Sequence, residues 1–266
     1  MPGTVLAGRY LLDVLRSEAT ISNAGAMQFD ATDLSSTNLV SVRIAPLSRL
    51  VDPLLGSTTS SDAFAIFEAQ CELAESLSHP CIETIYDHGD ATLDGERYVF
   101  TVAERLAGGS LREFLDRGRR LTPSQALIVG IDVCRALDAA AKQGIVHGDI
   151  RPSRLVFGLD RRVRLVGFGA PLRPVDSLNL DQARYSAPEL AEGSPRTGSS
   201  DIYGLALVLV EAMTGEVPFT ADTVAAAFAN RTDKLLPVSA DFGALAQVLE
   251  RAGRPTAGEQ IGRAHG

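Results

Sequence analysis

The residues best suited to chemistry gather in one short segment, Gly144-Ile145-Val146-His147-Gly148-Asp149-Ile150-Arg151-Pro152-Ser153-Arg154-Leu155. Its carboxylate, Asp149, could act as a general base, or it could hydrogen-bond nearby backbone as loop carboxylates often do. Two further segments stand downstream, Gly167-Phe168-Gly169 and Tyr185-Ser186-Ala187-Pro188-Glu189. Short patterns of Gly, Asp and Pro occur by chance, so each segment alone is weak support for any one chemistry.

The elements that must position these residues change character near residue 106. Before that point the chain has short extended stretches broken by turn-formers, which predict a small sheet. One amphipathic helix interrupts them, with apolar residues at three- and four-residue spacing. The predicted strands are residues 9–15, 27–31, 39–44 and 96–104, and the helix is 62–77.

Beyond residue 106 the pattern becomes helical, with helices predicted over 110–115, 123–143 and 202–213. Thr122 can cap the second of these, Pro123 suits its first position, and Gly144 stops it. Only residues 242–251 supply a helix near the end, so this half looks shortened at its C-terminus.

Composition excludes several classes of protein. The chain has 266 residues, 45% of them apolar, and a formal net charge of -8, which disfavours nucleic acid and anionic lipid as partners. No secretory signal opens the sequence, and the most apolar segment, 205–210, is far too short to cross a bilayer. Cys71, Cys81 and Cys134 are expected to be buried thiols in a reducing compartment. These features predict a cytoplasmic protein without membrane insertion.

Taken in order, the segments resemble the Ser/Thr protein kinases of the bacterial type. Residues 147–154 resemble the catalytic-loop pattern H-R-D-x-K-P-x-N, Gly167-Phe168-Gly169 its Asp-Phe-Gly turn, and Ala187-Pro188-Glu189 its Ala-Pro-Glu motif. The resemblance covers about residues 8–256. It implies an α+β, two-lobed protein kinase-like fold, with a small antiparallel-sheet N-lobe carrying one regulatory helix and a mainly helical C-lobe. The whole chain, 1–266, would form one domain, with the N-lobe at 1–105 and the C-lobe at 106–266.

The same resemblance shows that the chemical positions of the family are altered. Arg154 and Gly167 stand where the family has its two metal ligands, and Gly148 stands where it has the Arg before the catalytic Asp. Residues 16–26, in place of the Gly-rich phosphate loop, contain one Gly and an acidic residue. No metal site is therefore expected, and binding of Mg-ATP is predicted to be absent or weak.

The nucleotide-pocket positions are altered as well. Arg43 replaces the strand Lys, and Gln70 takes the place of its acidic partner on the regulatory helix. Arg43 could face the cleft or solvent, or it could pair with an acid or a phosphate. Ala103 is expected at the back of the pocket, with Glu104 to Leu106 forming the hinge.

What is retained is structural. The resemblance assigns His147 and Phe168 to stacking between the regulatory helix and the C-lobe, and Asp201 to holding the catalytic-loop backbone. It also pairs Glu189 with Arg254, a buried ion pair that is costly to break.

The loss of chemical positions beside a retained scaffold predicts a pseudokinase: not an enzyme, but a regulatory or scaffolding module in Ser/Thr phosphorylation signalling. Asp149 would then be a remnant of the catalytic base. The expected partner is a protein, either an active Ser/Thr kinase or a phosphopeptide-binding protein. Ser177 and Ser186 are candidate phosphoacceptors, with ordinary polar loop as the alternative reading.

Two alternatives remain open from the sequence. One is a weakly active or atypical Ser/Thr protein kinase that uses Asp149. The other is metal-independent nucleotide binding, in which Arg43 and Arg154 hold an anion. Stabilisation of the fold by nucleotide would separate these from a scaffold, because a ligand that binds only the folded state raises the melting temperature.

Overall fold

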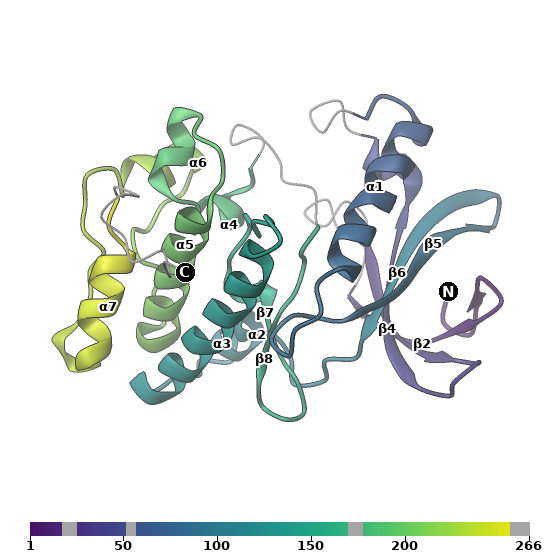
Figure 1. Ribbon diagram of the computed structural model, residues 1–266, viewed down its shortest axis with the longest axis horizontal. Coiled ribbons are helices and arrows are strands. Elements are labelled where there is room, and N and C mark those ends of the chain that lie inside the picture. Colours follow the sequence, from purple (N-terminus) through teal and green to yellow (C-terminus); the bar gives the residue numbers. More distant parts are fainter. Residues whose placement is uncertain (18–25, 52–56, 170–177, 256–266) are drawn as a thin grey trace. The chain divides into compact units, whose positions relative to one another are not determined.

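The computed structural model describes residues 1–17, 26–51, 57–169 and 178–255, and these fall into two compact units (Figure 1). The first unit contains Met1–Ala107 together with Phe168 and Gly169. The second contains Gly108–Gly167 and the described residues from 178 onward.

A six-stranded antiparallel sheet forms the frame of the first unit. Its spatial order is β1-β2-β3-β4-β6-β5, so β6 lies next to β4 and β5 forms the edge of the sheet. Alternate side chains such as Leu12, Phe29, Val42 and Val102 are fully buried and form the core on one face. The strands are β1 (Val5–Leu6), β2 (Tyr10–Ser17), β3 (Met27–Asp33), β4 (Leu39–Pro46), β5 (Ile85–Leu93) and β6 (Glu96–Glu104).

The single long helix of this unit, α1 (Ser60–Glu75), begins two residues earlier than predicted because of its cap. The Thr59 side chain accepts from the Asp62 amide, and the Asp62 carboxylate accepts from the Thr59 amide, at 3.2 and 3.0 Å. Phe64 and Phe67 pack on a cluster that includes Val99 of β6. The helix therefore lies on the sheet, as predicted.

The sequence did not predict β5. This strand, with His88, Gly89 and Asp90 in its middle, has no alternation of apolar and polar residues. It pairs with β6 along almost its whole length, and tertiary pairing overrides its weak propensity.

The second unit is mainly helical around α5 (Gly198–Thr214), most of whose residues are buried. A hairpin of β7 (Leu155–Phe157) and β8 (Val163–Leu165) follows the segment that contains Asp149. The α+β fold class, with an antiparallel sheet in one unit and helices in the other, is confirmed. The remaining helices are α2 (Leu111–Asp116), α3 (Pro123–Ala141), α4 (Leu180–Ala183), α6 (Val224–Ala229) and α7 (Ala244–Ala252), and short 3₁₀ turns are η2 (Leu47–Leu50), η4 (Pro152–Arg154), η6 (Pro188–Glu192) and η7 (Ala240–Phe242).

The cap predicted for α3 is present. Thr122 accepts from the Gln125 amide, Gln125 accepts from the Thr122 amide, and Pro123 occupies the first turn. Cys71 and Cys81 are buried, but Cys134 on α3 is exposed, so the expectation of three buried thiols is wrong for that residue. Among the described residues, no helix combines the length and apolar character that a membrane span requires.

Candidate functional site

The loop between α3 and β7 carries Asp149, and its backbone is hydrogen-bonded to a side chain of α5. Asp201, in the first turn of α5, accepts hydrogen bonds from the backbone amides of His147 and Gly148 at 2.9 and 2.7 Å. This is the contact that the resemblance implies for that position. Burial raises the pKa of the Asp201 carboxyl to about 7, although both amide donors oppose the rise.

His147 fixes the loop from within. Its Nδ1 accepts from the Asp149 amide at 3.2 Å, so Nε2 carries the proton and donates to the carbonyl of Val166 at 3.1 Å. The ring is buried, and burial lowers its pKa to about 4. His147 is therefore neutral and links the loop to the segment that ends in Gly167.

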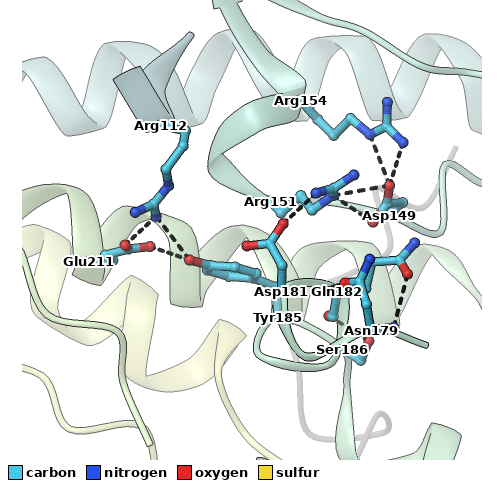
Figure 2. A network of polar contacts seen from close by, with 10 residues as sticks. All are labelled: Arg112, Asp149, Arg151, Arg154, Asn179, Asp181, Gln182, Tyr185, Ser186 and Glu211. Carbon is cyan, nitrogen blue, oxygen red and sulfur yellow. Dashed lines mark hydrogen bonds and ion pairs between the residues drawn. The ribbon is translucent and has the colours of Figure 1, made fainter. Parts of the chain in front are cut away.

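Two arginines enclose the carboxylate of Asp149 (Figure 2). Nε and Nη2 of Arg154 donate to Oδ2 at 2.8 and 2.7 Å. Nε of Arg151 donates to Oδ1 at 3.0 Å and to Oδ2 at 3.2 Å. Burial alone would raise the pKa of Asp149, but the charges of Arg154 and Arg151 outweigh it and the pKa is lowered. The carboxylate is therefore ionised, and guanidinium groups occupy both of its oxygens.

The position of the second metal ligand is filled by the same arginine. Gly167 has a φ of +95°, and a Cβ built on it would lie 2.8 Å from Nη1 and 3.1 Å from Cζ of Arg154. The Arg154 guanidinium thus takes up the space that an Asp side chain at 167 would need. A resident cation repels a divalent metal, and neither position supplies an oxygen ligand. These residues do not fit Mg²⁺.

In the first unit, Arg43 on β4 pairs with Glu83, a buried carboxylate between α1 and β5. Arg43 is therefore paired with an acid, one of the alternatives that the sequence left open, while 32% of its side chain stays exposed. The acid stands outside α1, so it is not at the Gln70 position. The one signal for Glu83 in the sequence was a lone acid after the apolar pair Cys81-Ile82.

The three expected pocket positions lie at the end of β6 or just after it. Ala103 is buried and opposite Ser41 of β4 in the register. Glu104 accepts from the Thr84 amide at 2.9 Å, and Leu106 is partly buried. Their role in holding a nucleotide stays a prediction.

Phe168 and Glu189 are both retained from the family pattern. Phe168 is buried. Among the described residues, none donates a hydrogen bond to either buried carboxylate oxygen of Glu189, and burial raises the pKa of this group. The pairing of Glu189 with Arg254 stays a prediction.

Sequence reasoning missed Arg231, the largest fully buried side chain of the described residues. Nε donates to the carbonyl of Ala227 at 2.6 Å and Nη2 to that of Ala183 at 2.7 Å, and Nη1 donates to the carbonyl of Ser186. No sequence motif marks an arginine that donates to backbone carbonyls, so this role could not be predicted from the sequence.

The candidate phosphoacceptors differ in what can be said of them. Ser177 lies outside the described residues. The hydroxyl of Ser186 donates to the carbonyl of Gln182 at 3.0 Å, which turns it toward its own chain. Phosphorylation of either stays a prediction.

Comparison with known proteins adds the family. The sequence pattern of the family described as "Protein kinase domain" matches residues 58–251. Serine/threonine-protein kinase PknB of Mycobacterium tuberculosis (strain H37Rv) is 32% identical over 193 residues, which are 69% of this chain and 31% of that protein. A probable serine/threonine-protein kinase PknB of Corynebacterium glutamicum is 30% identical over 228 residues, 82% of this chain and 33% of that protein. The chain spans about a third of the length of these curated relatives.

These matches correct one prediction. The expectation that the chain is not an enzyme is wrong, because the matching family and the relatives named as Ser/Thr kinases point to an enzyme. Arg154 and Gly167 are therefore differences from the usual metal-ligand residues within that family. With the fold, the loop anchored by Asp201 and the matches in agreement, the chain belongs to the protein kinase domain family, with bacterial Ser/Thr kinases among its relatives.

Proposed function

We propose that the chain is a degenerate Ser/Thr protein kinase-like domain that acts as a regulatory module in phosphorylation signalling and transfers phosphate weakly and in an atypical way. One observation carries the proposal: the Asp149 carboxylate is bound by Arg151 and Arg154, and Arg154 also occupies the space beside Gly167. A carboxylate that is held in two ion pairs is a poor proton acceptor until one of them opens.

The chemistry left to the chain's own residues is modest. His147 and Asp201 still hold the loop, so Asp149 keeps a fixed position. Arg154 adds a permanent positive charge next to it. A guanidinium stabilises phosphate oxygens by bidentate hydrogen bonds, which supports interaction with an anion without metal. The proposal includes weak or absent binding of Mg-ATP, because the residues at both ligand positions do not fit Mg²⁺.

The partners and location follow from the same proposal. The regulatory role requires a protein partner, either an active Ser/Thr kinase or a phosphopeptide-binding protein. The net charge of -8 argues against nucleic acid. Three free cysteines suit a reducing, cytoplasmic location.

The test restores both ligand positions at once. Purified wild type and the double variant Arg154→Asn/Gly167→Asp are incubated with radiolabelled ATP, Mg²⁺ and a generic Ser/Thr acceptor protein. The wild type should incorporate little phosphate. The double variant should incorporate at least about tenfold more, because Asn and Asp restore the oxygen ligands of the family and the Arg154 ion pair with Asp149 is removed.

The single variants are the matched controls. Gly167→Asp alone places its side chain against the Arg154 guanidinium, and Arg154→Asn alone restores only one ligand, so each should gain far less than the double variant. Adding Asp149→Asn to the double variant should remove the gain. Equal incorporation in wild type and double variant would refute the proposal. A thermal-shift series with ATP, with Mg²⁺ or EDTA, reports nucleotide binding separately from transfer.

A further inference from the structure

The inference begins with an exposed apolar stripe on α3. Leu127, Ile128 and Ile131 are 48%, 55% and 41% exposed, although the opposite face of the same helix is buried. Residues three and four positions apart lie on one side of a helix, so the three side chains are neighbours. A single exposed apolar side chain needs no explanation, but a cluster of them on one helix face indicates a contact surface.

The β7–β8 hairpin borders this stripe. Nε of Arg162 in the hairpin donates to the buried carboxylate of Asp132 at 2.8 Å, and Asp132 follows Ile131 directly on α3. Ile128 stands four residues before Asp132, one helical turn away. The turn of the hairpin adds Leu159, which is 81% exposed. Exposed apolar side chains are therefore present on both elements.

The same surface is basic, although the whole chain is acidic. The hairpin carries three arginines and one aspartate, whereas the net charge of the chain is -8. Arg161 in the turn is exposed, and the Arg135 side chain on α3 is 60% exposed. We call Ile128, Ile131, Arg135, Leu159 and Arg161 the basic face. Its charge favours an acidic partner, and another copy of this acidic chain is such a partner.

In the first unit, α1 presents a surface of the opposite charge. The helix contains four acidic residues and no Lys or Arg. Glu68, Ala69, Glu72 and Leu73 are exposed, and their spacing places them on one side of the helix. We call these four residues the acidic face. It also combines charge with apolar side chains, and the small Ala69 leaves room for another element to approach.

We propose that the chain self-associates head to tail, with the acidic face of α1 in one copy docked on the basic face of α3 and the β7–β8 hairpin in another copy. The contact involves one unit from each copy. Because the two faces differ, each copy offers both of them, and association continues into chains or closes into rings. This assembly goes beyond the proposed function and does not depend on phosphate transfer.

The first measurement is sedimentation velocity of the purified chain at protein concentrations from about 5 to about 200 µM in low salt. The contact is small and rimmed by exposed charges, so a Kd on the order of tens of micromolar is expected. The average mass should therefore rise from that of one chain to that of two or more. Raising NaCl to about 500 mM should weaken the association at least about threefold. A constant mass of one chain would overturn self-association and leave a foreign acidic segment as the occupant of the basic face.

Two charge-reversal variants test the faces separately. Arg135→Glu/Arg161→Glu makes the basic face acidic, and Glu68→Arg/Glu72→Arg makes the acidic face basic. Each variant alone places like charges across the contact, so each should associate at least about tenfold more weakly than the wild type. Full association in either variant would overturn the assignment of its face.

The matched controls change exposed residues on other elements. Lys234→Glu/Arg251→Glu alters the net charge as much as the basic-face variant does, and it should associate like the wild type. Ile128→Gln removes apolar contact and should weaken association about three- to tenfold, whereas Leu235→Gln, at a residue that is 71% exposed, should not. Equal weakening in the controls would mean that association follows net charge and general hydrophobicity, which would overturn the proposal.

An equimolar mixture of the two charge-reversal variants separates lost contact from lost folding. In the mixture each reversed face meets a reversed face of opposite charge, and each unchanged face meets its original partner. Association should therefore return to within about threefold of the wild type. Unfolded variants could not regain it, and circular dichroism checks that each variant is folded. A mixture of folded variants that stays monomeric would overturn the pairing of these two faces.

Discussion

At the scale of single residues, Gly118 and Gly169 share a backbone conformation but not an environment. Their φ angles are +74° and +73°, in the left-handed region that side chains rarely adopt. A Cβ at Gly118 would meet nothing within 4 Å, whereas at Gly169 it would lie 2.2 Å from the carbonyl oxygen of Gln70 on α1. Gly169 is thus in direct contact with the α1 backbone within the first unit, with no room for a side chain.

Gly169→Ala should therefore destabilise the protein more than Gly118→Ala. The latter measures backbone strain alone, about 1 kcal/mol. The former adds a clash with backbone that cannot rotate away, and at least about 2 kcal/mol more is expected. Urea denaturation of both variants gives the two free energies of unfolding. Equal losses would mean that α1 yields to the methyl group and that the contact is not rigid.

At the scale of elements, the second unit is stabilised by side chains that donate hydrogen bonds to the backbone carbonyls of neighbouring elements. Arg231, just after α6, supplies donors to three carbonyls from two segments. An apolar replacement of similar length leaves those carbonyls buried without donors.

Arg231→Met should lower the free energy of unfolding by about 2–4 kcal/mol. The comparison variant is Arg251→Met, whose arginine is exposed on α7 and should change stability by less than about 0.5 kcal/mol. Chemical denaturation provides the measurement. A loss below about 1 kcal/mol for Arg231→Met would show that water replaces the lost donors and that Arg231 is not essential to the attachment of α4.

At the scale of the whole molecule, stability should depend on pH through two buried groups with opposite signs. His147 has a pKa of about 4 in the folded state, below its ordinary 6.5, so its contribution is complete above pH 6.5 and declines as the pH falls toward 4. Burial raises the pKa of Asp201 to about 7 in the folded state, above the ordinary value for an Asp. Its contribution to folding stability is therefore complete in acid and declines as the pH rises from about 4 to 7. The two slopes partly cancel.

His147→Gln separates them, because Gln can accept from the Asp149 amide and donate to Val166 without titrating. The stability of wild type relative to this variant should fall by up to about 3 kcal/mol between pH 7 and pH 4. His79→Gln is the matched control, since Nδ1 of His79 also accepts the amide two residues on, at 3.2 Å. Parallel pH curves for wild type and His147→Gln, from urea titrations, would contradict the assignment.

Much of the fold could be predicted from the sequence, because periodicity and caps are local. The strand 96–104 and the start of α3 at Pro123 were placed correctly. The pairing of Arg43 with Glu83, the carbonyls held by Arg231 and the edge strand β5 could not be, since long-range contacts set them. The resemblance also indicated that Arg154 and Gly167 stand at the metal-ligand positions of the family. Only the structure shows that the Arg154 guanidinium fills the space beside Gly167.

That complementarity between Arg154 and Gly167 has a consequence for how the sequence can change. A mutation of Gly167 to Asp meets the Arg154 guanidinium, and a mutation of Arg154 to Asn leaves Gly167 without the group that fills the space beside it. Because the two residues share one space, the effects of the two substitutions on stability and on phosphate transfer should not add. This non-additivity, or epistasis, means that the tolerance of either position to change depends on which residue stands at the other.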